Sequence, residues 1–266
     1  MRILSLFVLL VFSFLTITAS AKVVGNEVEY TSDGVTMKGY MAYDDSVEGK
    51  RPGVLVVHEW WGHNDYARAR ADKLAALGYT ALAVDMYGDG KTADHPEKAG
   101  ELSGAVMSNL DMAEKRFQAA MDYLKQQPTV NPEYMAAIGY CFGGGVVLNM
   151  ALRGVDLDGV VSFHGILPQE APENAKPTAD IVVFHGGDDP FVPRDQFDKF
   201  KKIMQDTGAN YEIVVYPGVK HSFTNPDADK YGKQFDLPLV YDKDADEKSW
   251  EQTQAFLNRI FQPENN

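Results

Sequence analysis

One short stretch constrains the fold of this chain more than any other. An apolar, strand-like run from Tyr134 ends in Gly139-Tyr-Cys141-Phe-Gly143 and continues as a helical segment. The spacing is that of a nucleophile elbow, with cysteine where serine is more usual. It predicts a sharp turn that holds the sulfur of Cys141 above the sheet edge, and glycines beside it because Cβ atoms there would collide with the neighbouring strand and helix. The N–H groups and positive dipole end of the following helix would favour the thiolate.

Two other interpretations of this stretch compete with a catalytic one. A single buried cysteine is often only a small hydrophobic residue. A dinucleotide-binding loop would use Gly139 and Gly144 as the outer glycines of G-x-G-x-x-G, but the middle position is Cys141. Because the backbone must approach a pyrophosphate at that position, the cysteine side chain would block the ligand. We therefore expect no nucleotide site.

Apolar runs typical of buried strands alternate along the chain with segments of helical spacing. Strands are predicted over residues 52–57, 79–84, 134–140, 159–163, 181–184 and 211–216, after a hairpin formed by 27–31 and 35–42. Helices are predicted over residues 64–77, 109–126, 197–204 and 245–261, besides the one that follows the elbow. This alternation is typical of an α/β fold with a mostly parallel central sheet and helices on both faces. In such sheets, ligand sites lie beyond the carboxyl ends of the strands.

Residues 1–21 have the features of a secretory signal peptide. Arg2 supplies a positive start, residues 3–17 are mostly apolar, and Ala19-Ser-Ala21 is a small-residue cleavage site. A membrane anchor is disfavoured because the apolar run is short and no stop-transfer pattern follows. We expect an exported protein, periplasmic or secreted, whose residues 22–266 form one domain. Its single cysteine permits no internal disulfide, so the thiol is either well buried or kept for chemistry.

Charge and spacing limit the partners that this chain can have. A formal net charge of −13 repels phosphate backbones and anionic membrane surfaces, so we expect neither a nucleic-acid partner nor membrane binding after signal cleavage. His58-Glu59 opens like the zinc motif H-E-x-x-H, but position 62 is glycine and no other pair of candidate ligands has the required spacing. We expect no metal or cofactor, a small-molecule substrate, and a monomer or weak homo-oligomer.

The residues that follow the predicted strands include an ordered catalytic set. Cys141, Asp189 and His221 occur in the order nucleophile, acid and base. His221 would take the thiol proton and return it to the leaving group, while Asp189 would hold the imidazole in the right tautomer. The N–H groups of Phe142 and Trp60 would stabilise the oxyanion. Taken singly, His221 could be a surface histidine and Asp189 a turn residue. Together with the elbow, they predict attack on an ester or lactone carbonyl and a thioester intermediate.

Three motifs together resemble the dienelactone hydrolase family, whose members are also called carboxymethylenebutenolidases. They are the elbow, the stretch Gly186-Gly-Asp-Asp-Pro-Phe-Val-Pro193, and Lys220-His-Ser-Phe223. The resemblance extends from about residue 27 to residue 261 and implies an α/β-hydrolase fold with the same triad. It also implies that Glu59 takes the thiol proton when substrate arrives. In the family's resting state, an arginine holds that carboxylate while the thiol is turned away.

The chain departs from that family at the positions that grip a substrate carboxylate. The family uses two arginines, but this chain has Asn225 at one position and Gly88-Asp89 at the other. Neither can replace a guanidinium fork, and Lys91 is only a mobile point charge, so we expect neutral esters or lactones to be preferred.

Aromatic residues and one long polar segment are expected to line or cover the substrate pocket. Asn225 is expected at the substrate pocket. Trp60, Trp61 and Tyr87 are expected to line its mouth, with ordinary aromatic packing under a loop as the alternative. Residues 224–244 are polar and without clear periodicity, so they are expected to form a loop that either covers the site or is a surface excursion.

Two functions of other classes stay open at this stage. A non-catalytic, exported binding protein on the same fold would have a thiol inert to iodoacetamide. A thiol-redox protein would form a stable mixed disulfide and lack esterase activity. The redox function is disfavoured because the chain has no resolving cysteine.

Overall fold

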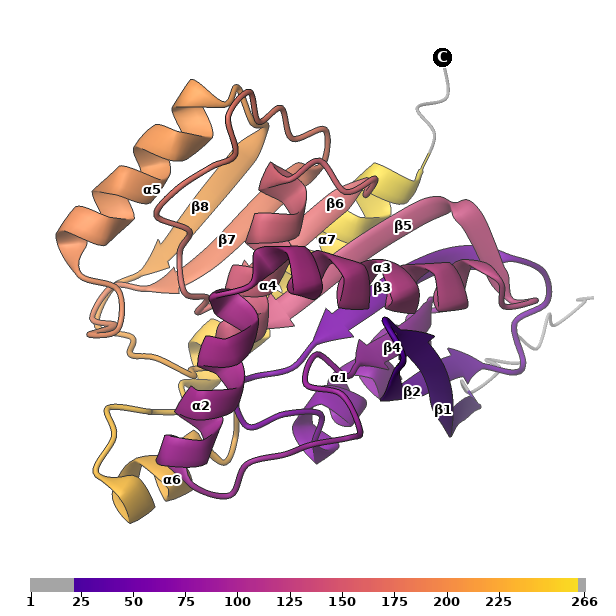
Figure 1. Cartoon of the computed structure of the whole chain (residues 1–266), viewed down its shortest axis with the longest axis horizontal. Coiled ribbons are helices and arrows are strands. Elements are labelled where there is room, and N and C mark those ends of the chain that lie inside the picture. Colours follow the sequence, from indigo (N-terminus) through magenta and orange to yellow (C-terminus); the bar gives the residue numbers. More distant parts are fainter. Residues whose placement is uncertain (1–21, 263–266) are drawn as a thin grey trace, which may run out of the picture.

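The computed structural model describes residues 22–262, which form an eight-stranded sheet with helices on both faces (Figure 1). The expected signal peptide, residues 1–21, lies outside the described residues. The strands are β1 (Val23–Ser32), β2 (Val35–Asp44), β3 (Arg51–Val57), β4 (Thr80–Val84), β5 (Val130–Tyr140), β6 (Gly159–Phe163), β7 (Asp180–Gly186) and β8 (Tyr211–Tyr216). The helices are α1 (Asp65–Ala75), α2 (Pro96–Met107), α3 (Leu110–Lys125), α4 (Phe142–Leu152), α5 (Arg194–Asp206), α6 (Ala228–Phe235) and α7 (Lys243–Phe261).

The sheet is mostly parallel, and the strand order is β1-β2-β4-β3-β5-β6-β7-β8. Among the strands of residues 22–262, only β1 with β2 and β2 with β4 pair antiparallel. The central strands are apolar on both faces, and every residue of β4 and β6 is buried. Because a parallel strand is covered by crossover helices on both sides, such continuous apolar runs are expected. The predicted α/β-hydrolase fold is confirmed.

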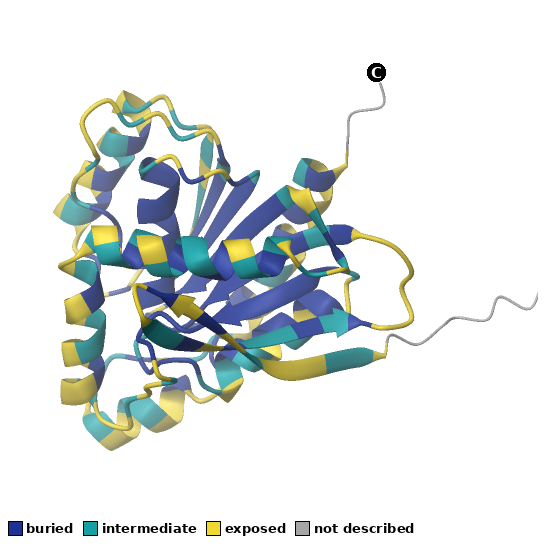
Figure 2. Cartoon of the chain, turned by 45° about the vertical axis from the view of Figure 1, so that its right-hand side comes forward, coloured by how far each residue is buried: buried dark blue, intermediate teal, exposed yellow. Residues whose placement is uncertain are grey.

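Two apolar layers enclose the sheet. On one face, helices α3, α4 and α5 contribute side chains such as Phe117, Val147 and Phe200. On the other face, α1 and α7 contribute Leu74 and Phe256. Figure 2 shows the strands as a buried layer between helices whose outer sides are exposed. No helix among residues 22–262 combines the length and the apolar character needed to cross a membrane.

Two helices were not predicted from the sequence, and one of them corrects the loop expected over residues 224–244. That segment contains α6, whose Tyr231 stacks on Trp61 with ring centroids 4.8 Å apart. The other is α2, which begins with Pro96 in the first turn and His95 as its N-cap. Both lie at the end of the molecule beyond the carboxyl ends of the parallel strands (Figure 1). They were missed because α6 has only eight residues and α2 contains two glycines, which lower its helix propensity.

Candidate active site

The turn between β5 and α4 holds Cys141 in an unusual backbone conformation. Its φ is +53°, in a region that residues with a Cβ seldom adopt. The N–H of Cys141 donates to the carbonyl of Phe163 (3.0 Å), and the carbonyl of Cys141 accepts from Ile166 (3.3 Å). A Cβ on Gly139 would collide with the carbonyl of Gly143, so the close approach expected at this turn is confirmed. Strand, turn and helix together support the conformation.

A cavity of about 300 Å³ opens beside the sulfur. Cys141 is 7% exposed and faces it. Among the described residues, those lining the cavity include no lysine, arginine, aspartate or glutamate, and apart from Cys141, His221 and Ser103 they are apolar or glycine. The lining consists of Trp60, Gly100, Ser103, Gly104, Met107, Cys141, Phe142, Ile166, Phe191, His221 and Leu239. The site therefore suits an uncharged, mainly apolar molecule.

His221 and Asp189 meet next to this cavity. The Nδ1 atom of His221 lies 2.7 Å from Oδ2 of Asp189, and both side chains are buried. The other carboxylate oxygen of Asp189 accepts the N–H of Phe191 at 2.9 Å. Burial by itself lowers the pKa of His221, but the sulfur of Cys141 and the carboxylate of Asp189 raise it above its ordinary value. The arrangement orients an imidazole that can accept a proton beside the sulfur.

Two backbone N–H groups are available as oxyanion donors. Within residues 22–262, the N–H groups of Phe142 and Trp60 donate to no protein acceptor. His58 supports this region: its Nε2 accepts the N–H of Met86 (3.3 Å), so its Nδ1 carries the proton that is donated to the carbonyl of Glu59 (2.6 Å). The imidazole is thus neutral, in agreement with the lowering of its pKa by burial. It stacks on Phe142 and holds the loop after β3 against the elbow.

Glu59 is 2% exposed and is held by the loop that follows β8. Its carboxylate accepts from Nδ2 of Asn225 at 2.5 Å and from Oγ of Ser222 at 3.1 Å. Burial raises the pKa of Glu59, and both hydrogen bonds oppose that rise. Ser222 follows Glu59 by 163 residues in the sequence, and Asn225 follows it by 166 residues. No local sequence signal therefore connects these partners to Glu59.

Three residues expected in the substrate pocket lie outside the cavity lining. Asn225 binds Glu59 instead. Trp61 is 3% exposed and packs under α6. Tyr87 donates its hydroxyl to the carbonyl of Trp60 at 2.9 Å and lies behind the wall. Of the four pocket residues considered from sequence, only Trp60 lines the cavity. The ring of Trp61 packs against that of Trp60, with centroids 4.9 Å apart, and against α6.

Several residues without a catalytic motif in the sequence complete the cavity. Helix α2 contributes one wall, with two glycines four residues apart that a helix prediction over 96–107 would have placed on one face. The remaining ones are Ile166, Phe191 and Leu239, for which the sequence carries no distinct signal. In the described part of the chain, no group of three or more His, Cys, Asp or Glu side chains is arranged to hold a metal ion.

Comparisons with known proteins agree with this architecture. A family model for the dienelactone hydrolase family matches residues 37–261. The chain is similar to Protein usf of Aquifex pyrophilus, with 33% identity over 239 residues that cover 88% of this chain and 97% of that protein. It is also similar to a putative carboxymethylenebutenolidase of Aquifex aeolicus, with 31% identity over 207 residues, covering 76% and 87% of the two chains.

Among solved structures, one similar chain is a dienelactone hydrolase-like promiscuous phosphotriesterase from metagenomic libraries. The TM-score is 0.84 and the identity 33%, over 90% of this chain and 99% of that one. The region matched by the family model includes every residue of the site described above.

Proposed function

Because this chain belongs to the dienelactone hydrolase family and is a hydrolase of esters or lactones, we propose that Cys141, His221 and Asp189 are its catalytic triad. The observation that carries the proposal is the meeting of three features at one cavity: a sulfur in a strained turn, an imidazole 2.7 Å from a buried carboxylate, and two N–H donors without protein acceptors. This is the arrangement that acyl transfer to a nucleophile requires.

In the proposed first half-reaction, the thiol of Cys141 gives its proton to His221, directly or by way of Glu59, and the sulfur attacks the carbonyl carbon. As the C–S bond forms, the carbonyl electron pair moves to oxygen, where the N–H groups of Phe142 and Trp60 stabilise the negative charge. The intermediate collapses, the C–O bond breaks, and the leaving alkoxide takes a proton from His221. The product is a thioester on Cys141.

In the second half-reaction, His221 takes a proton from water and the resulting hydroxide attacks the thioester carbonyl. The C–S bond breaks, the sulfur of Cys141 takes the proton back from His221, and the carboxylic acid product departs. Asp189 stabilises the imidazolium that forms in each half-reaction.

The proposed substrates are neutral esters and lactones of modest size. The cavity of about 300 Å³ has an apolar lining with no lysine or arginine among the described residues. A carboxylate taken into it would lose its hydration without gaining a charged partner. The same lining suits neutral phosphotriesters, and a similar solved structure is a promiscuous phosphotriesterase, so we propose such triesters as secondary substrates.

We also propose that the enzyme is exported and that its mature chain, residues 22–266, acts as one domain and as a monomer or weak homo-oligomer. The support is the pattern of residues 1–21, a positive start, an apolar run and small residues before Lys22. Mass spectrometry of the protein recovered from the expressing cell's periplasm or medium tests this. A chain that begins at Met1 in the cytoplasm would contradict it.

The activity test compares the mature protein with Cys141→Ala on matched p-nitrophenyl esters, neutral lactones and carboxylated lactones. We expect hydrolysis of the neutral compounds to be lost in the variant. Mass spectrometry after an acid quench should find one acyl group on the peptide that contains Cys141. Equal rates for both proteins, or an adduct on another residue, would remove the proposal.

A further inference from the structure

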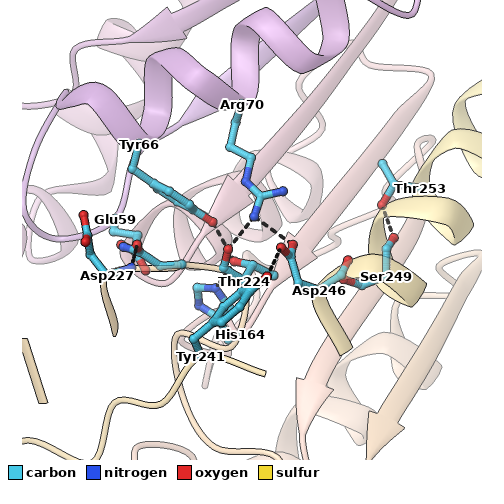
Figure 3. Close-up of polar contacts among 11 residues, drawn as sticks. Glu59, Tyr66, Arg70, His164, Thr224, Asp227, Tyr241, Asp246, Ser249 and Thr253 are labelled. Carbon is cyan, nitrogen blue, oxygen red and sulfur yellow. Dashed lines mark hydrogen bonds and ion pairs between the residues drawn. The ribbon is translucent and has the colours of Figure 1, made fainter. Parts of the chain in front are cut away.

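Behind the catalytic histidine, a buried hydrogen-bond network is centred on Thr224 (Figure 3). Thr224 belongs to the loop that carries His221, Ser222 and Asn225. Its Oγ1 lies 2.6 Å from the hydroxyl of Tyr66 on α1 and 2.7 Å from Nε2 of His164, which follows β6. Its carbonyl accepts from Nη2 of Arg70, also on α1, at 2.5 Å. The loop is thus held from its far side by two other parts of the fold.

Arg70 extends this network to the C-terminal helix. The Nη2 atom that reaches Thr224 also lies 2.8 Å from Oδ1 of Asp246 on α7, and Arg70 is 3% exposed. The guanidinium lies over three aromatic rings, those of Tyr66 (5.1 Å), Tyr140 (5.2 Å) and Trp250 (5.8 Å). Figure 3 shows Arg70 between Tyr66 and Asp246, with Thr224 below it. One side chain therefore joins α1, the loop and α7.

Stability alone explains this ion pair poorly. Removing two charges from water is unfavourable, and a buried pair is often no more stabilising than apolar residues of the same volume. Within residues 22–262, moreover, Nη1 of Arg70 has no hydrogen-bond acceptor. Such pairs are better explained where a defined geometry or a local charge is needed.

The candidate active site beside this network needs both a defined loop geometry and a local positive charge. Glu59 is a buried carboxylate whose hydrogen-bond donors, Asn225 and Ser222, are neutral. Among the described residues, the cavity lining offers no lysine or arginine to balance its charge. Arg70 is a permanent cation paired with Asp246, and it bonds the carbonyl of Thr224, the chain neighbour of the Asn225 that binds Glu59. It lies behind the loop rather than in the cavity lining.

We propose that Arg70 is a positioning residue of this hydrolase, which fixes the loop of residues 221–225 through Thr224 and supplies the buried positive charge that stabilises the carboxylate of Glu59. This inference rests on the proposed function. It explains how a buried carboxylate held by the loop of the proposed catalytic histidine is stabilised while the cavity lining remains free of lysine and arginine among the described residues. A guanidinium inside the cavity would favour acidic substrates instead.

The effect of Arg70 has a defined sign. Burial raises the pKa of Glu59, whereas the charges of His221 and Arg70 lower it, together with the two hydrogen bonds. Loss of Arg70 should raise that pKa and move the acidic limb of the activity profile to higher pH. The titratable or charged groups that face Glu59 come from the β8–α6 loop, α1, β5 and α6, and are His221, Arg70, Tyr66, Tyr140 and Tyr231.

The main test is the double variant Arg70→Met with Asp246→Asn, which leaves no unpaired charge in the interior. We expect kcat for a neutral p-nitrophenyl ester to fall about 10- to 100-fold at pH 7 with KM little changed, because the loop is misplaced. The acidic limb of kcat/KM should also move to higher pH. The matched control is Arg153→Met, which breaks the ion pairs with Asp111 and Glu114 on the opposite face of the sheet and should leave both measurements unchanged.

Two single variants separate the positioning of the loop of residues 221–225 from the charge effect on Glu59. They also replace the double variant as the test if that protein does not fold. Thr224→Val removes the hydroxyl contacts to Tyr66 and His164 that also hold the loop, but it keeps the Arg70 charge and the bond from Arg70 to the carbonyl of residue 224. If loop position and charge act separately, kcat should fall while the acidic limb of the pH profile stays in place. Arg70→Lys should likewise keep the limb, because the cation remains. A limb that moves in Arg70→Lys, or a double variant that melts at a lower temperature but retains the wild-type kcat and pH profile well below that temperature, would overturn the proposal.

A separate measurement distinguishes failure of this inference from failure of the proposed function. The rate at which iodoacetamide alkylates Cys141 can be followed against pH without any ester. We expect the double variant to shift this profile to higher pH relative to wild type and to Arg153→Met. An unchanged profile counts against Arg70. Wild-type protein that hydrolyses none of the esters or lactones would refute the proposed function alone.

Discussion

Two glycines of α2 carry a sharp prediction about substrate size. Gly100 and Gly104 lie one helical turn apart and both line the cavity. A Cβ at either position would meet no other heavy atom within 4 Å, so packing does not require glycine there. Glycine inside a helix is destabilising by about 0.5–1 kcal/mol relative to alanine. We infer that side chains are absent because they would occupy the volume that the substrate needs.

The perturbation is a pair of substitutions at Gly104. Gly104→Ala should raise the free energy of unfolding by about 0.5–1 kcal/mol, since it removes the entropic penalty without a clash. Gly104→Leu should not destabilise the helix, but it fills part of a cavity of about 300 Å³. Each methylene excluded from an apolar pocket is worth about 1–3 kcal/mol, or about 10- to 200-fold in kcat/KM. That loss should fall on long acyl chains.

The assay compares kcat/KM for p-nitrophenyl acetate and p-nitrophenyl hexanoate, with urea unfolding of each protein. The hexanoate-to-acetate ratio should fall by at least about tenfold in Gly104→Leu. Ala105→Leu is the matched control, because Ala105 lies on the same helix but outside this cavity lining. A ratio equal to that of wild type, or a Gly104→Ala protein less stable than wild type, would refute the reasoning.

Three further predictions concern the elbow, the acidic group and the histidine. Gly143→Ala places a Cβ against the carbonyls of Val57 and His58, and we expect a loss of about 1–3 kcal/mol or more in urea unfolding. Asn225→Leu removes a donor that lowers the pKa of Glu59, so the acidic limb of kcat/KM should move to higher pH; a limb at its wild-type position would show that Glu59 does not control it. Finally, the pKa of His221 is raised from 6.5 to about 10, so its stabilising contribution is fully present below pH 6.5 and lost as the pH rises towards 10. Unfolding free energies over that range should fall more steeply in wild type than in Cys141→Ala, in which the sulfur that raises this pKa is missing.

The sheet was predictable because the strands can be recognised from the sequence of each strand alone. Each central strand is buried on both faces and therefore reads as an apolar run between polar turns. The predicted bounds of residues 159–163 and 211–216 coincide with β6 and β8. Helices α2 and α6 were not predicted, because α2 contains two glycines and α6 has only eight residues, so their local helical signal is weak.

In the candidate site, too, the features that are local in sequence were predictable and the contacts between distant residues were not. The elbow is local, since its glycines and cysteine lie within five consecutive residues, and the order of Cys141, Asp189 and His221 can be read directly. The partners of Glu59 could not be predicted, because they depend on a contact across more than 160 residues. For the same reason, the pocket roles expected of Trp61, Tyr87 and Asn225 do not match where these residues lie.

The burial of Arg70 is the clearest example of a feature that its neighbours in the sequence do not predict. In the sequence it is one of two arginines in a helix of mixed polarity, a pattern typical of a solvent-exposed face. Its side chain is buried because α7, which carries Asp246 176 residues later, packs over it.

Short-range chemistry was therefore sufficient to predict the parallel sheet, the strained cysteine turn and the order of the proposed triad residues along the chain. Those features depend on backbone sterics and apolar periodicity, which act over a few neighbouring residues. The charge balance around Glu59 and the shape of the cavity required the assembled molecule. Burial and Coulomb interactions depend on distance in space, and the groups that set them are far apart along the chain.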